Sequence, residues 1–323
     1  AKIDMTVASA SFSADGKFIY FISPDQGLES VFEFDLKTKK HRKITSGDYD
    51  YNSISVGKGF LICSRTSMND PAELFKVDIN PDNHRDGTAT QLTFTNKDLL
   101  KDVKPAIIEK RWITTSDNKK MLTWVVYPPD FDKTKKYPAL LYCQGGPQST
   151  VSQFFSYRWN LRLMASKGYI IIAPNRRGLP SFGQKWNDDI SKDWGGQVMD
   201  DYLAATDSLA KEPYVNKDKM GAVGASYGGY SVYYLAGIHE NRFKTFISHC
   251  GLFNMESWYG TTEELFFANN EFGGPYWKEE NKNIYEKNSP HNFIKNWNTP
   301  ILVIHGEKDY RRLSVGRNHG DGY

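Results

Sequence analysis

The sequence predicts a chain of two parts, an all-β segment over residues 1–104 and an α/β domain with a mostly parallel sheet over residues 105–323. Two observations lead to this prediction. In the first part, short runs with alternating apolar residues are separated by turns such as Asp15-Gly16. In the second part, continuous apolar runs alternate with segments of helical periodicity. That alternation is typical of parallel strands covered by helices on both faces.

The all-β part contains one pattern of short strands twice, at a spacing of about 45–50 residues, which is typical of β-propeller blades. In the first copy, residues 10–17 are expected to form a short strand and the turn Asp15-Gly16, and strands are expected at 18–23, 31–36 and 43–45. In the second copy, strands are expected at 59–64, 73–78 and 90–93. Residues 1–104 are therefore predicted to form about two blades, the last ones of a longer propeller. A small independent β-sandwich is the alternative.

The α/β part is predicted to open with a hairpin of two strands, 109–115 and 121–127. Five apolar strands follow, expected at 138–143, 169–173, 220–224, 243–248 and 300–305, of which the first is expected to be buried. Helices are expected between them, at 160–167, 200–211 and 230–238. This order of elements favours one parallel sheet with helices on both faces.

The pattern Gly224-x-Ser226-x-Gly228 lies where a predicted strand meets a predicted helix. In an α/β-hydrolase this junction is the nucleophile elbow, a tight turn that needs small residues on both sides of the serine. The sequence therefore predicts an α/β-hydrolase fold with Ser226 as the nucleophile. A glycine-rich turn with an incidental serine is the alternative.

A nucleophilic serine needs a base, an acid that orients the base, and donors for the oxyanion. In this fold the acid follows the serine in the chain, and the histidine base follows the acid. Asp309, in the loop after the last predicted strand, is the candidate acid, and Glu307 is a weaker one. His305 is more typical of a packed structural histidine. After Asp309 only His319 remains, in a tail without strand or helix pattern, so the domain is predicted to be truncated before its catalytic histidine, with His319 a minor alternative.

Two backbone N–H groups are candidates for the oxyanion hole. The first belongs to Tyr227, directly after the nucleophile. The second is expected in the loop 144–147, where paired glycines let the backbone approach a substrate carbonyl, and Gly146 is the preferred donor. A plain turn is the alternative for this loop.

Composition excludes several other classes of protein. A net charge of +3, spread evenly along the chain, does not favour nucleic acid as a partner. The three cysteines form no C-x-x-C pair, so neither a zinc site nor a disulfide framework is predicted, and all three are expected to be free and buried. No apolar run reaches the roughly 18–20 residues that span a bilayer.

Four motifs, in this order, resemble the prolyl oligopeptidase family of serine peptidases: residues 141–149, 173–178, 224–230 and 305–310. The resemblance implies an N-terminal propeller joined to a C-terminal hydrolase, with the active site between them and access limited to short peptides. It implies Ser226 as nucleophile, Asp309 as acid, Tyr227 and Gly146 as oxyanion donors, and a histidine beyond residue 323. It also implies dipeptidyl-peptidase-like activity, no metal or organic cofactor, and a periplasmic or secreted location.

The segment 252–259 lies where this family builds the wall of its S1 pocket. Trp258 and Tyr259 are therefore candidates for apolar contacts with the substrate, and core aromatics are the alternative.

The reaction itself leaves two further alternatives open. An esterase would use the same machinery, because ester and amide acyl transfer share the triad. The missing base would also fit a catalytically incomplete fragment or a pseudoenzyme. The sequence does not predict an oligomeric state.

Overall fold

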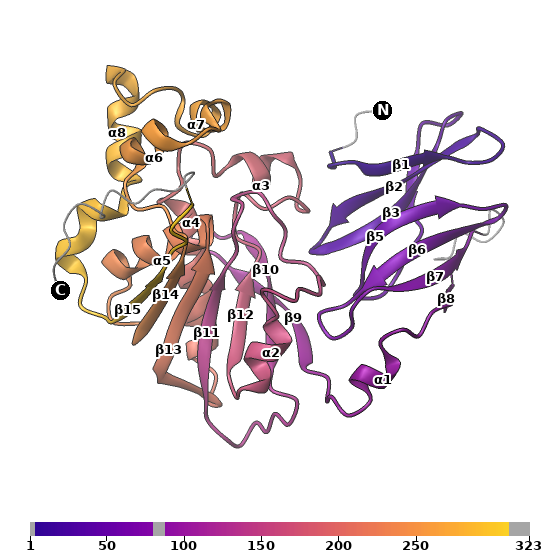
Figure 1. Ribbon diagram of the computed structural model, residues 1–323, viewed down its shortest axis with the longest axis horizontal. Coiled ribbons are helices and arrows are strands. Elements are labelled where there is room, and N and C mark those ends of the chain that lie inside the picture. Colours follow the sequence, from indigo (N-terminus) through magenta and orange to yellow (C-terminus); the bar gives the residue numbers. More distant parts are fainter. Residues whose placement is uncertain (1–3, 80–87, 310–323) are drawn as a thin grey trace.

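The computed structural model describes residues 4–79 and 88–309, which form three β-sheets and the helices that cover the largest of them (Figure 1). The all-β part lies to one side of the α/β part, and a connecting segment that contains α1 (Lys97–Leu100) joins the two. His319 lies outside the described residues.

The all-β part consists of two four-stranded antiparallel sheets, each with its strands in chain order. This confirms the repeated pattern of strands, although β5 has a polar, half-exposed sequence that the pattern did not predict. The two sheets contact each other through β5, which lies against β1, β2 and β3. The strands are β1 (Ala8–Phe12), β2 (Phe18–Asp25), β3 (Leu28–Asp35), β4 (His41–Lys43), β5 (Asp50–Val56), β6 (Phe60–Thr66), β7 (Glu73–Asp78) and β8 (Ala89–Gln91).

The α/β part is built on a seven-stranded sheet with the order β15-β14-β13-β11-β12-β10-β9. The hairpin of β9 and β10 is antiparallel, and the remaining strands are parallel to one another. The predicted hairpin and the five predicted strands are all present. The strands are β9 (Ile107–Thr114), β10 (Lys120–Tyr127), β11 (Tyr137–Cys143), β12 (Ile170–Pro174), β13 (Val215–Ala225), β14 (Thr245–His249) and β15 (Ile301–Ile304).

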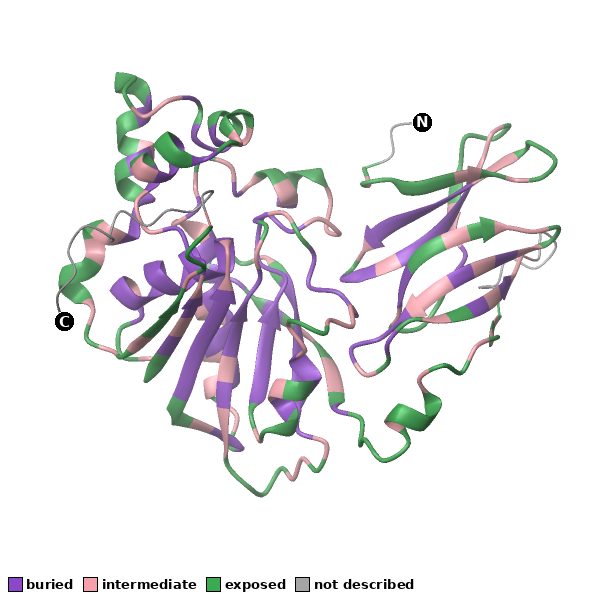
Figure 2. Ribbon diagram, viewed as in Figure 1, coloured by how far each residue is buried: buried purple, intermediate pink, exposed green. Residues whose placement is uncertain are grey.

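Helices cover both faces of this sheet, because successive side chains of its strands point into two different cores. In β12, Ile170 and Ile172 pack in the core that α4 and α5 cover, whereas Ile171 and Ala173 pack in the core under α2. Figure 2 shows the inner strands as almost continuously buried. The mostly parallel sheet of an α/β-hydrolase, predicted from the unalternating apolar runs, is confirmed. The helices are α2 (Leu161–Ser166), α3 (Gln184–Asp188), α4 (Gln197–Ala210), α5 (Tyr227–Ile238), α6 (Met255–Thr261), α7 (Leu265–Phe272), α8 (Glu279–Lys287) and the 3₁₀ helix η1 (Pro290–Asn296).

Loops of the two small sheets contact the α/β part by hydrogen bonds. The backbone N–H of Gly27 donates to Ser181 Oγ at 2.7 Å, and the N–H of Met68 donates to Gln153 Oε1 at 3.1 Å. From the other side, Arg162 of α2 donates to the carbonyl of Asn69. These contacts place loops of the all-β part beside the carboxyl ends of the parallel strands.

The three cysteines are free and buried, as predicted. In the part of the chain that the structure describes, no helix has the length and apolar character needed to cross a bilayer.

Candidate active site

Ser226 lies directly after β13 and directly before α5, at the carboxyl edge of the sheet. Its backbone has φ 63° and ψ −124°, a conformation that non-glycine residues rarely adopt. Its N–H donates to the carbonyl of His249, at the end of the neighbouring strand β14, at 3.0 Å. Such strain at a serine between strand and helix is the geometry of a nucleophile elbow.

Gly224 and Gly228 make this turn possible, because neither position has room for a Cβ atom. A Cβ atom on Gly224 would lie 2.5 Å from the carbonyl oxygen of Gly228, and one on Gly228 would lie 2.0 Å from that of Cys143. Both distances are below 3.0 Å, which Cβ atoms in folded proteins essentially never show for non-bonded contacts. The spacing G-x-S-x-G is therefore a steric requirement of this turn.

Tyr227 is the first residue of α5, so its backbone N–H has no acceptor inside the helix. Its side chain points into the core, where the hydroxyl donates to the carbonyl of Trp194 at 2.8 Å. The N–H at the start of the helix is thus left available for an oxyanion, and the helix dipole favours negative charge there.

The loop 144–147 after β11 packs against the nucleophile turn. A Cβ atom on Gly145 would lie 3.0 Å from the carbonyl oxygen of Ala225 and 3.6 Å from Cβ of Ser226. The next residue, Gly146, has φ 121°, which a side chain would not tolerate. The structure thus brings the predicted loop to the predicted serine, with Gly145 as the residue in contact and Gly146 beside it.

Two buried charged side chains hold this loop. The guanidinium of Arg176 donates to the carbonyls of Gln144, at 3.2 Å, and Pro147, at 2.9 Å. On the other flank, the side chain of Gln148 donates to the carboxylate of Glu271 at 3.1 Å. Arg176 and Glu271 are 0% and 1% exposed. The sequence motif contained Arg176, but nothing in it indicated this contact, and Glu271 was not singled out.

Asp309 lies in the loop after β15, at the same edge of the sheet as Ser226. The register places Ala225, His249 and Ile304 side by side on β13, β14 and β15. The Asp309 carboxylate lies 3.9 Å from Nε2 of His305, and its N–H donates to the carbonyl of Gly306. The alternative acid, Glu307, is exposed in the same loop.

The base for Ser226 is not found among the described residues. Within residues 4–79 and 88–309, the hydroxyl of Ser226 makes no hydrogen bond, so no histidine there is placed to accept its proton. His305 is mostly buried, in keeping with a packed histidine, and interacts with Asp309 instead. His319, the minor alternative, lies outside the described residues.

Trp258 and Tyr259 lie in the hydrophobic core, with 5% and 7% of their surfaces exposed. Trp258 packs against Trp194, with ring centroids 5.6 Å apart. The hydroxyl of Tyr259 donates to Asn269 at 2.9 Å. Both side chains thus pack in the core beneath α6, and their contact with substrate stays a prediction.

A cavity of about 410 Å³ lies next to the oxyanion loop. It lies between the all-β part and the α/β part, and Gln144 of the loop and Ser149 just after it contribute to its wall. Phe154 and Trp159 add apolar surface, and Glu29 from β3 is one of its two acidic residues.

The second acidic residue is Asp50, at the start of β5. It accepts hydrogen bonds from the N–H of Glu29 at 3.0 Å and from the hydroxyl of Ser152 at 2.5 Å. Burial raises the pKa of Asp50 to about 6. Burial and the nearby Asp50 raise the pKa of Glu29 to about 7. Among the described residues, the Glu29 side chain has neither a hydrogen-bond partner nor a cationic neighbour.

Sequence reasoning missed this acidic pair. Glu29 and Asp50 are isolated acids in β-strand patterns, and Asp50 is 102 residues from Ser152 in the chain. No local signal in the sequence brings them to the oxyanion loop.

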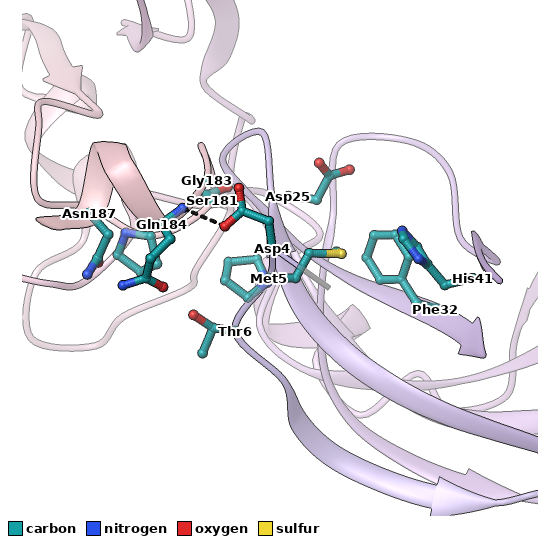
Figure 3. Close-up of a pocket in the computed structure, with 12 residues that line it drawn as sticks. Asp4, Met5, Thr6, Asp25, Phe32, His41, Ser181, Gly183, Gln184 and Asn187 are labelled. Carbon is teal, nitrogen blue, oxygen red and sulfur yellow. Dashed lines mark hydrogen bonds between the residues drawn. The ribbon is translucent and has the colours of Figure 1, made fainter. Parts of the chain in front are cut away.

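Another cavity, of about 340 Å³, lies between the first small sheet and the segment that leads into α3. Figure 3 shows Asp4 there, accepting a hydrogen bond from the backbone N–H of Gln184 at the start of α3. His41 and Asp25 lie on its other side. The cavity does not include Ser226, so it is not part of the candidate active site. Among the residues that the structure describes, no three His, Cys, Asp or Glu side chains come together as metal ligands would.

Comparison with known proteins identifies relatives of the whole described fold. Dipeptidyl-peptidase 5 of Porphyromonas gingivalis is 54% identical over 314 residues, which cover 96% of this chain and 45% of that protein. Dipeptidyl-peptidase 5 of Schizosaccharomyces pombe is 35% identical over 270 residues, which cover 82% of this chain and 38% of that protein. The chain therefore spans less than half the length of these relatives.

Among solved structures, the acylaminoacyl peptidase of Pyrococcus horikoshii superposes with a TM-score of 0.82 at 26% identity. The superposition covers 96% of this chain and 48% of that structure. A sequence model of the prolyl oligopeptidase family matches residues 155–314, which include the elbow serine and the loop after β15. With this match and relatives at such identity, the chain belongs to the prolyl oligopeptidase family.

Proposed function

We propose that this chain carries the nucleophile and the oxyanion hole of a serine peptidase that cleaves short peptides. The observation that carries the proposal is the strained backbone of Ser226, at φ 63°, between a buried strand and the first turn of α5. The names of the relatives, dipeptidyl-peptidase 5 and acylaminoacyl peptidase, support a peptide substrate. An esterase on the same machinery is the second candidate.

The reaction follows from these positions. The Ser226 oxygen adds to the peptide carbonyl carbon while its proton passes to a histidine base, and the carbonyl oxygen becomes an oxyanion. The N–H groups of Tyr227 and Gly146 are the proposed donors to that oxyanion. The C–N bond then breaks, and the base returns the proton to the leaving amine. Water hydrolyses the acyl-enzyme by the same steps, and Asp309 is the proposed acid that orients the histidine.

Labelling with a fluorophosphonate probe tests the nucleophile. We expect a chain that includes the catalytic histidine to be labelled and its Ser226→Ala variant to be unlabelled, because only an activated serine attacks phosphorus at a useful rate. Ser166→Ala, at an exposed position at the end of α2, is the matched control and should keep full labelling. Labelling that persists in Ser226→Ala, or no labelling of the folded protein with its histidine present, would contradict the proposed site.

The acidic cavity supports a more specific proposal, in which Glu29 binds the free amino group of the peptide. The carboxylate lies in a cavity shared with the oxyanion loop and has no cation of its own among the described residues. A substrate ammonium group would supply that missing charge, and a charge-assisted hydrogen bond of this kind is worth about 1.5–3 kcal/mol. This would make the peptidase dipeptidyl-peptidase-like, because a short cavity with a fixed amino end limits how far the substrate extends into the site.

Kinetics on matched substrates test the role of Glu29. We expect Glu29→Gln to raise KM for a dipeptidyl amide with a free amino group by roughly 10- to 100-fold and to leave KM for its N-acetyl analogue unchanged. The pH dependence follows from the raised pKa of Glu29, near 7, because only its ionised form binds the ammonium group. KM for the free substrate should therefore fall as the pH rises through about 7, and rise again above about 8 as the α-amino group loses its proton.

The N-acetyl substrate is the internal control for both effects, since it carries no charge at that end. An equal rise in KM for the two substrates in Glu29→Gln would contradict the proposal and point to a structural role for this carboxylate.

The two small sheets are proposed to be adjacent blades of a β-propeller. Each has four antiparallel strands in chain order, and the two sheets lie against each other along β5. This arrangement would place the wall of the acidic cavity at the mouth of the propeller. A structure of the full-length protein, with these sheets arranged radially about one axis, would test it; two sheets stacked face to face would instead indicate a sandwich.

A further inference from the structure

Arg176 is a buried cation without a carboxylate partner. It follows β12, is 0% exposed, and among the described residues forms no ion pair. Its guanidinium donates to three backbone carbonyls and to the hydroxyl of Tyr202, at distances of 2.8–3.2 Å. Two of these carbonyls, Gln144 and Pro147, lie on either side of the glycine pair of the oxyanion loop.

The same guanidinium also packs on the residue that follows the nucleophile. Its central carbon lies 4.5 Å from the ring centroid of Tyr227, a cation–π distance. Arg176 therefore contacts both elements that supply the proposed oxyanion donors, the loop 144–147 and the first residue of α5.

The neighbouring Arg177 differs from Arg176, because its charge is paired with carboxylates. Arg177 is also buried, but it forms ion pairs with Asp117, at 2.7 Å, and Asp201, at 3.1 Å. Its charge is balanced by carboxylates from α4 and from the turn between β9 and β10. Arg177 thus joins structural elements through ion pairs, whereas Arg176 contacts the oxyanion loop.

The physical reason for a guanidinium at this place lies in the two glycines. Glycine has more backbone freedom than any other residue type. Without a restraint, the N–H groups of Gly145 and Gly146 would therefore point in many directions. A planar fork that donates to the carbonyls at both ends of the pair restricts that freedom. Because no carboxylate neutralises it, its positive charge also remains beside the place where the oxyanion forms.

We propose that Arg176 is a positioning residue for the oxyanion hole, which fixes the glycine loop relative to the N-terminus of α5 and favours negative charge there. This inference rests on the proposed peptidase function. Its specific consequence is that loss of Arg176 weakens binding of the tetrahedral adduct and leaves binding of the unreacted substrate intact.

A matched pair of ligands measures this difference. A dipeptidyl aldehyde adds reversibly to Ser226, so that one C–O bond forms, the serine proton passes to the base and an alkoxide occupies the oxyanion hole. The corresponding dipeptidyl alcohol binds the same subsites but has no carbonyl to attack. We expect Arg176→Met to weaken the aldehyde by about 100-fold and the alcohol by less than about threefold, with kcat falling in parallel with the aldehyde affinity and KM nearly constant.

Two further variants separate positioning from general destabilisation. Arg177→Met is the control, since it removes a buried guanidinium that does not contact the loop: it should lower the melting temperature and keep the wild-type ratio of aldehyde to alcohol affinity. Arg176→Lys keeps the charge but lacks the planar fork, and we expect a loss of about tenfold in that ratio. If Arg176→Met does not fold, the affinity ratio of Arg176→Lys tests the proposal in its place.

A wild-type ratio in a folded Arg176 variant, or an equal loss in Arg177→Met, would overturn the inference. In either case the wild-type protein still shows serine-dependent labelling and turnover, so the proposed function stands. A folded wild-type protein without labelling or turnover would overturn the proposed function, and this inference with it.

Discussion

Gly228 lies in the first turn of α5, at a position where a helix would ordinarily favour alanine. Alanine is excluded there by the carbonyl of Cys143, 2.0 Å from where its Cβ atom would lie. Gly224, one turn earlier, is excluded by the same carbonyl and by that of Gly228. The strain of Ser226 is thus maintained by close contacts between backbone atoms, which no side-chain rearrangement can relieve.

A pair of glycine-to-alanine variants tests this argument. We expect Gly228→Ala to lower the free energy of unfolding by about 2 kcal/mol or more and to abolish labelling of Ser226, because backbone atoms must move. Gly260→Ala, in α6, meets nothing within 4 Å and should instead raise the free energy of unfolding by about 0.5–1 kcal/mol. Urea unfolding measures both changes. Effects of the same sign in the two variants would contradict the steric account.

At the scale of secondary structure elements, the Arg177 cluster fixes the α/β part around the active-site edge. Its guanidinium joins the segment after β12 to Asp201 in α4 and to Asp117 in the turn between β9 and β10. The hydrogen bonds from Arg177 hold the pKa of Asp117 well below its ordinary value. Because this pKa is lowered in the folded state, its contribution to stability is present above about pH 4 and is lost as the pH falls below that.

Substitutions at two aspartates of α4 test how much this cluster contributes. We expect Asp201→Ala to lower the free energy of unfolding by about 3–5 kcal/mol, because it leaves the buried Arg177 without its inner partner. Asp207→Ala, in the same helix, removes a partly exposed ion pair with Arg242 and should cost less than about 1 kcal/mol. Chemical unfolding at neutral pH provides the comparison, and similar losses in both variants would show that burial does not set the contribution.

At the scale of the whole molecule, Arg162 of α2 joins the two parts of the chain. Its guanidinium donates to the carbonyl of Asn69 in the all-β part, and to those of Val103 and Lys104 in the connecting segment. Arg162 is 7% exposed, so these hydrogen bonds are made by a largely buried guanidinium. One side chain thus fixes the loop, the connection and the helix together.

Loss of this contact should loosen the connection before it unfolds either part. We expect Arg162→Met to raise the rate of proteolytic cleavage within residues 97–105 by about tenfold or more, while fluorescence still reports a folded core. Arg158→Met, nearby on the chain and more exposed, is the control and should be cleaved at the wild-type rate. Unchanged cleavage in Arg162→Met would contradict a role for Arg162 in joining the parts.

The features that the sequence predicts are those that depend on residues close together in the chain. The strands of the parallel sheet and the elbow at Ser226 follow from local patterns, because apolar runs and glycine spacing are read over a few residues. The helices α6–α8 were not predicted. They are short and are stabilised by tertiary packing, such as Phe272 against Tyr285 with ring centroids 4.9 Å apart. Glu29 and Arg176 could not be assigned for the same reason, since their partners are distant in the chain.

The two-sided burial of β12 has a consequence for how this family can vary. Every residue of the strand is buried, and alternate side chains pack in different cores. We therefore expect a substitution at any position of the strand to lower stability. In β9, at the edge of the sheet, fully exposed positions alternate with less exposed ones from Lys110 to Thr114. Mutational tolerance should therefore be uniformly low along β12 and periodic along β9. We therefore expect divergence among relatives to concentrate at the margins of the sheet, and the centre, which carries the nucleophile, to change little.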